Sequence, residues 1–193
     1  DGAGARRFAM YGLLIAFASQ LLTLALLPFL GVILSPIGVT APVRELIHGY
    51  MSLRLLSVGA AVGLEALASY YGGLKNTLLP MTAQVFAMVL NVLLNWVLIG
   101  GHWGAPAMGV RGSALASTIA TSTAFLFLVG CFAMQLGTRG TRVSAGALRA
   151  RELWRTLRCG LPVGLNFLVE LLAFLVYVNV VVGTLGTAEL AVA

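Results

Sequence analysis

One acidic residue stands inside a long apolar stretch near the end of this sequence. Glu170 lies within residues 161–182, which contain no other charged side chain, and Asn166 precedes it by one helical turn. A carboxylate inside a membrane is costly unless it pairs, faces a cavity, or takes up a proton or a cation. We therefore consider Glu170 and Asn166 a candidate site for H⁺ or Na⁺. The alternative is a buried, hydrogen-bonded Glu with a structural role.

A second polar group lies in an earlier apolar stretch, at Asn91 and Asn95. Residues with this spacing share one face of a helix, and amide side chains in lipid must find hydrogen bonds within the helix bundle. The pair predicts either contacts between helices or a polar patch that lines a central cavity. Hydroxyl side chains in the following stretch, Thr118 among them, are expected either to line the same space or to pack between helices.

Arg54 and Glu65 share a third apolar stretch. If this stretch is one continuous helix, they lie on one stripe about 16 Å apart, too far to pair with each other. Both a structural role at the membrane interface and contact with a substrate remain open for these two residues.

The composition places all these residues in a membrane protein. The chain is 60% hydrophobic and 9% charged, whereas a soluble domain carries about 25% charged residues. A spanning helix needs about 20 mostly apolar residues, and five stretches meet this length: 8–34, with a kink expected at Pro28, 47–71, 78–99, 112–136 and 161–182. The sequence predicts an all-α integral membrane bundle of about five helices. A turn at 183–187 would lead into a further helix.

The charge distribution predicts the orientation of the bundle. The net charge is +6, but the basic residues lie between apolar stretches, so we expect no nucleic-acid partner. With the N-terminal end in the cytoplasm, the external loops hold only Arg44 and Arg111 as Lys or Arg residues. The cytoplasmic segments then hold nine, five of them in the basic loop expected at 137–156, just before Arg158. The positive-inside rule therefore places this loop in the cytoplasm. Both ends of the sequence lie close to or inside apolar stretches, which is typical of a fragment.

Motifs of catalysis are missing from the sequence. It contains no GxSxG, HExxH or Walker motif, and we expect no enzyme and no cofactor. Without a nucleotide-binding motif, any transport would be driven by an ion gradient or run downhill.

Several motifs follow one another between residues 71 and 120. They are G-x-x-N-T-x-x-P-M at 73–81, L-N-x-x-L-N-x-x-L-I at 90–99 and G-x-x-G-x-P-x-x-G-x-x-G at 101–112, and the later stretch CGLPVGLNFLVELLAF contains Glu170. In order and spacing, they resemble the multidrug and toxic compound extrusion (MATE) transporters, especially the NorM-like branch. The resemblance covers nearly the whole chain.

The resemblance implies a twelve-helix, two-lobe transporter of which this chain supplies helices three to seven. Residues 1–136 would belong to the N-lobe, 137–157 to the cytoplasmic linker and 158–193 to the start of the C-lobe. Such proteins export cationic or amphiphilic small molecules across the cell membrane, the inner membrane in bacteria, in exchange for Na⁺ or H⁺ by alternating access. The partners implied are the substrate, the lipid bilayer and the remaining helices of the same transporter.

The resemblance also suggests roles for single residues. Glu170, with Asn166 beside it, matches the carboxylate of the C-lobe cation site, where it would be a possible Na⁺ ligand. Asn91 and Asn95 match the fifth-helix pair of the N-lobe site, with Thr118 near them. Many relatives have Asp where this chain has Asn95, so coupling through Glu170 gains weight. The acidic partners of both sites lie on helices that this sequence does not contain.

Two other functions remain open from the sequence. The first is a flippase for lipid-linked oligosaccharides in the same superfamily. Such flippases line their cavities with many basic residues, and only Arg54 is a candidate here. The second is a membrane assembly subunit that transports nothing, for which Glu170→Gln would have no functional effect. A membrane enzyme is the weakest alternative because no catalytic grouping is present.

Overall fold

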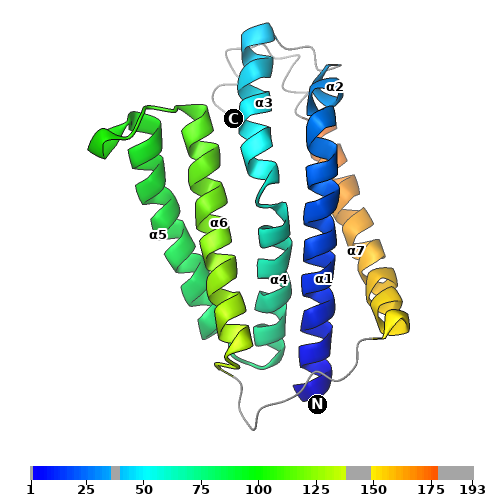
Figure 1. The fold of residues 1–193 in the computed structure, drawn as a ribbon. Coiled ribbons are helices and arrows are strands. Elements are labelled where there is room, and N and C mark those ends of the chain that lie inside the picture. The colour runs from blue at the N-terminus through cyan, green and yellow to red at the C-terminus, as the bar shows by residue number, and fades with distance from the viewer. Residues whose placement is uncertain (1, 36–39, 138–148, 178–193) are drawn as a thin grey trace. The chain divides into compact units, whose positions relative to one another are not determined.

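The computed structural model describes residues 2–35, 40–137 and 149–177, and within these ranges it contains helices and no strands. The elements, in chain order, are α1 (Gly2–Leu26), η1 (Leu27–Phe29), α2 (Leu30–Leu34), α3 (Ala41–Leu55), α4 (Val58–Gly73), α5 (Leu78–Gly100), η2 (His102–Gly104), α6 (Val110–Ala133) and α7 (Ala150–Val176) (Figure 1). Elements α1 to α6 form one compact unit, and α7 belongs to a second.

The described helices agree with the prediction of about five membrane spans. Among the described residues, four helical stretches are long and apolar enough to cross a membrane, at Gly4–Val32, Leu78–Gly100, Val110–Ala133 and Ala150–Phe174. The pair α3 and α4 makes a fifth if it is counted as one span. The fold is therefore the all-α membrane bundle that the composition predicts.

The first span is interrupted at Pro28, where the sequence predicts a kink. Helix α1 ends at Leu26, and a 3-10 turn that contains Pro28 leads into α2. Proline has no N–H to donate, and its ring clashes with the preceding turn, so the α-helical hydrogen-bond ladder is interrupted there.

The second span departs from the prediction of one continuous helix. It consists of α3 and α4, which meet at a break around Leu56 and Ser57 and are bent by 45°. No proline lies at this break, and its cause is found in side chains of neighbouring helices, described below. Because the helix is broken between Arg54 and Glu65, the separation estimated from a straight helix does not apply to them.

Helices α4 and α6 form the centre of the first unit. Helix α4 packs against α1 on one side and against α6 on the other, and α6 also packs against α5 (Figure 1). The core between them includes Leu67, Tyr71, Ala124 and Leu128, all fully buried. Most large apolar side chains elsewhere are exposed, as expected of a bundle whose outer solvent is lipid.

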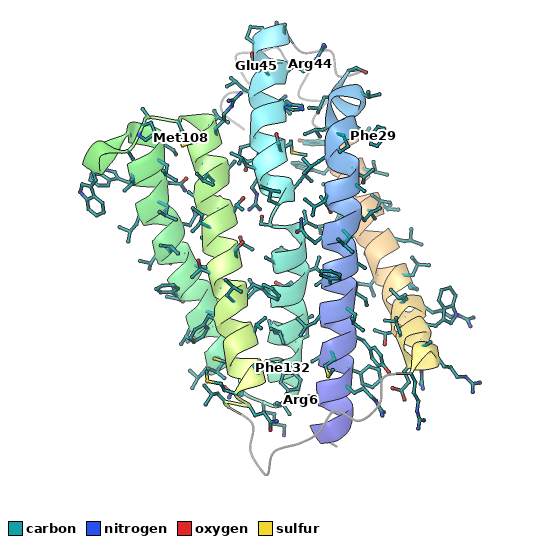
Figure 2. All side chains as sticks on the ribbon, viewed as in Figure 1. Arg6, Phe29, Arg44, Glu45, Met108 and Phe132 are labelled. Atoms are coloured by element: carbon teal, nitrogen blue, oxygen red, sulfur yellow. The ribbon has the colours of Figure 1, made fainter. Side chains whose placement is uncertain are left out.

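Contacts at one end of this unit bring distant segments together. The guanidinium carbon of Arg6 lies 4.7 Å from the ring centroid of Phe132, and Asn76 Nδ2 donates to the carbonyl oxygen of Gly137 over 3.0 Å. Figure 2 shows Arg6 and Phe132 at one end of the unit and Glu45 at the other. The start of α1, the α4–α5 connection and the end of α6 therefore meet at the same end.

In the second unit, the predicted end of the basic loop is wrong. Residues 137–156 were predicted to be a loop, but α7 begins at Ala150. Arg151, Arg155 and Arg158 follow at helical spacing, and together they form a charged stripe on the first turns of α7. A charged segment can continue a membrane helix into water, so a hydropathy limit does not mark the helix end. The predicted turn at 183–187 lies outside the described residues.

Candidate functional site

A polar cavity of about 370 Å³ lies among α3, α4, α5 and α6. Its apolar wall includes Leu64, Ala87, Met88 and Ala120. Its polar lining consists of Arg54, Glu65, Gln84, Asn91, Ser117 and Thr121. Helices α5 and α6, which carry four of these six side chains, are each apolar enough to cross a membrane, and a cavity with a guanidinium, a carboxylate and two amides is therefore the natural candidate site.

A short hydrogen-bonded chain joins α5 to α6 beside this cavity. Asn91 Nδ2 donates to Ser117 Oγ over 3.0 Å, and Asn95 Nδ2 donates to Asn91 Oδ1 over 3.0 Å. The two asparagines share one face, as their spacing predicts, and both are partly buried. The buried Oδ1 of Asn95 has no hydrogen-bond partner among the described residues. The series of hydrogen bonds therefore ends in an acceptor that could bind another donor.

This chain of hydrogen bonds leads to a stability prediction. Asn91→Ala and Ser117→Ala each remove the same hydrogen bond. Their effects on the free energy of unfolding should therefore not be additive. We expect a coupling free energy of about 0.6 kcal/mol, and at most about 1.7 kcal/mol, as for hydrogen bonds between membrane helices. Denaturant unfolding in detergent micelles measures the cycle. Asn91→Ala combined with Ser113→Ala, one turn away on α6, is the control and should be additive.

Arg54 and Glu65 approach the cavity from the two sides of the α3–α4 break. Arg54 lies in the last turn of α3, where its Nη1 is 3.4 Å from Ser57 Oγ. Glu65 lies in α4, is exposed, and has no ion pair or hydrogen bond to the described part of the chain. The carboxylate of Glu65 is therefore available to a ligand in the cavity.

Thr118 was predicted for this site, and Glu170 with Asn166 for a separate cation site. Thr118 Oγ1 donates to the carbonyl oxygen of Leu53 over 3.0 Å, so its hydroxyl binds the backbone of α3, and Ser117 and Thr121 line the cavity in its place. Glu170 and Asn166 are carried by α7 in the second unit, one turn apart and both exposed. The structure thus joins Asn91, Asn95 and Ser117 into one group.

Two features of the cavity were missed in the sequence. Gln84 precedes Asn91 by two helical turns on α5, and that spacing would have indicated a shared face. The sequence predicted Arg54 and Glu65 on one stripe of a helix, but it did not indicate that both line this cavity, nor that a break lies between them. Among the described residues, no three His, Cys, Asp or Glu side chains cluster as a metal site would require.

Comparison with known proteins relates this chain to one protein family. The family model described as MatE matches residues 3–97, which include both Asn91 and Asn95. The probable multidrug resistance protein NorM of Agrobacterium fabrum is 27% identical over 193 residues, which cover 99% of this chain and 41% of that protein. The protein of the same description from Chromobacterium violaceum is 31% identical over 165 residues, which cover 78% of this chain and 35% of its own length.

A solved structure has the same fold. It is described as the inward-facing conformation of a multidrug resistance MATE family transporter of the MOP superfamily, and it superposes with a TM-score of 0.69 at 23% identity. The match covers 84% of this chain and 36% of that one. The chain thus spans about two fifths of the length of the curated relatives it matches. The family model and the relatives thus show that this chain is similar to the MATE family of transporters, and the solved structure shows that it shares their fold.

Proposed function

We propose that the protein containing this chain exports cationic and amphiphilic small molecules in exchange for Na⁺ or H⁺ by alternating access. The observation that carries the proposal is the polar cavity between membrane helices, with the Glu65 carboxylate on its lining and without a partner in the described part of the chain. The names of the relatives, multidrug resistance proteins, support it. Relatives that export drugs need a site that tolerates many ligands, and an open cavity with apolar walls and few polar groups fits that need.

Roles for the named residues follow from this proposal. Glu170, with Asn166, is the carboxylate that binds the coupling ion in the second half of the protein. Asn91, Asn95 and their partner Ser117 form the polar site of the first half, and Glu65 supplies the negative charge that a cation in this cavity requires. If the ion and the substrate cannot be bound at the same time, the protein exchanges one for the other across the membrane.

The same proposal gives the arrangement in the cell. Residues 1–136 belong to the first lobe, 137–157 to the linker between lobes and 158–193 to the start of the second lobe. The N-terminal end and the linker face the cytoplasm of a bacterial inner membrane. The contacts of Arg6 with Phe132 and of Asn76 with Gly137 support this orientation, because they place the start of α1 and the end of α6 at the same end of the bundle.

Export of a fluorescent cation from drug-sensitive cells tests the proposal. Cells that express the complete gene product should lose the dye faster than cells with an empty vector. Collapse of the Na⁺ or H⁺ gradient should make the two rates of dye loss equal. Glu65→Gln should raise the apparent KM for the cation, because the cavity loses its charge. Glu45→Gln, at the exposed start of the same span, should leave the KM unchanged. Equal dye loss with and without the protein would reject the proposal.

A further inference from the structure

The break between α3 and α4 interrupts the backbone hydrogen-bond ladder. The N–H groups of Leu56 and Ser57 donate to carbonyl oxygens only three residues back, those of Leu53 and Arg54. In a continuous helix the N–H of Gly59 would donate to the carbonyl oxygen of Leu55, four residues earlier. Here α3 ends at Leu55, α4 begins at Val58, and the two helices are bent by 45°. Within a membrane, both freed backbone groups need other partners.

The side-chain amide of Gln20, on α1, provides both partners. The N–H of Gly59 donates to Gln20 Oε1 over 2.8 Å, and Gln20 Nε2 donates to the carbonyl oxygen of Leu55 over 3.2 Å. One amide is thus inserted into the missing bond and accepts and donates as a peptide group would. Insertion of a side chain into the ladder is a recognised cause of helix kinks, and no proline is needed here.

Two more side chains satisfy the neighbouring carbonyl groups of α3. Ser57 Oγ donates to the carbonyl oxygen of Arg54 over 3.0 Å, and Thr118 Oγ1 donates to that of Leu53 over 3.0 Å. Ser57 is 2% exposed. The last three carbonyl groups of α3 therefore each accept a side-chain hydrogen bond, and two of the donors come from other helices. The bend is specified by its neighbours and not by the local sequence.

Close packing and free space both surround Gln20. A Cβ added to Gly59 would lie 2.6 Å from Gln20 Cβ and 2.9 Å from the carbonyl oxygen of Ala16, so only glycine allows α1 to approach this closely. A mostly apolar cavity of about 460 Å³ adjoins the break, and Gln20, Gly59 and Phe125 line it. The amide therefore has room to leave the gap by a change of rotamer.

The break lies between the two charged residues of the polar cavity. Arg54 is in the last turn before it and Glu65 is in the helix after it, and both line the cavity. We propose that Gln20 is a positioning residue, whose amide holds the α3–α4 bend and thereby sets the separation of Arg54 and Glu65 around the cavity. When the amide withdraws, the bond from Gly59 to Leu55 closes and the span straightens. The role of this separation in transport rests on the proposed function, but the bend itself does not.

Distance measurement in the complete gene product tests the bend without any assay of transport. Spin labels at the exposed positions Val43 and Ser69, one on each side of the break, report its angle once Cys131 and Cys159 are replaced by Ser. From the helix rise, straightening by 45° lengthens the distance between them by about 3 Å. Gln20→Leu, similar in size but unable to bridge, should shift the distance distribution to this longer value. Thr23→Val is the control, because Thr23 Oγ1 bonds only to Ser19 within its own helix, and it should leave the distribution unchanged.

A second variant and a transport readout complete the test. Gln20→Asn keeps the amide on a shorter side chain that cannot reach both groups, and it should give a bimodal distribution even if Gln20→Leu fails to fold. In the efflux assay, Gln20→Leu should raise the KM for a cation severalfold with less change in kcat, since the geometry of the cavity changes. A distance distribution equal to wild type in Gln20→Asn would overturn the proposal. A shifted distance in a protein that exports nothing would keep the bend and reject the proposed function.

Discussion

Glu170→Gln should strongly reduce ion-driven export while the protein still reaches the membrane. The substitution keeps the shape of the side chain and removes the charge that a proton or Na⁺ requires. The rest of the stretch 161–182 offers no other carboxylate to replace it. Loss of a charged ligand costs about 1.5–3 kcal/mol, so we expect the initial rate of gradient-driven export to fall about tenfold or more.

The control for this variant lies on the same helix. Glu152 is in the first turn of α7, among the basic residues that precede the apolar stretch, and Glu152→Gln should export at nearly the wild-type rate. Both variants are compared at equal amounts of protein in the membrane. If Glu170→Gln exports as fast as wild type, Glu170 has a structural role and the coupling ion binds elsewhere.

Gly112→Ala should be the most destabilising of the small substitutions in the first unit. Helix α6 passes α5 so closely there that an added Cβ would lie 2.6 Å from the carbonyl oxygen of Leu98 and 2.8 Å from its carbonyl carbon. These are backbone atoms, which cannot move aside as a flexible side chain would. Overpacking of this kind costs about 1–3 kcal/mol and outweighs the gain of at most about 1 kcal/mol from replacing glycine within a helix.

Thermal unfolding of the complete gene product in detergent measures this effect. Gly112→Ala should lower the Tm by several degrees. Gly130→Ala, on the same helix, is the matched control, because an added Cβ there meets no atom within 4 Å, and its Tm should stay equal or rise slightly. Equal melting of the two variants would show that α5 and α6 are not packed as described.

The spans could be predicted from the sequence because hydropathy depends on composition over a window of residues. The stretch 78–99 was placed within a residue of α5, Leu78–Gly100. The end of the basic loop was placed too late, since charged residues such as Arg151 and Arg155 exclude a segment from lipid but not from a helix. Hydropathy predicts where a segment enters lipid, whereas helix propensity predicts where it is helical. Here α7 begins before the apolar stretch does.

The site was predicted in part for a similar reason. Asn91 and Asn95 are neighbours on one helix, so their spacing was enough to bring them together. The break in the second span could not be predicted, because the amide that causes it is Gln20, which is 39 residues from Gly59 in the sequence. Contacts of this kind depend on which helices pack side by side, and neither periodicity nor composition carries that information. The separation of Arg54 and Glu65 could not be estimated from the sequence either, because the break lies between them.

Transport by the purified protein in liposomes tests the central proposal most directly. The complete gene product is reconstituted, a Na⁺ or pH gradient is imposed, and movement of a fluorescent organic cation across the bilayer is followed. The cation should accumulate against its own gradient only while the imposed ion gradient lasts, and the flux should be lost in Glu170→Gln. Equal dye movement in liposomes with and without protein, under either gradient, would contradict an ion-coupled exporter.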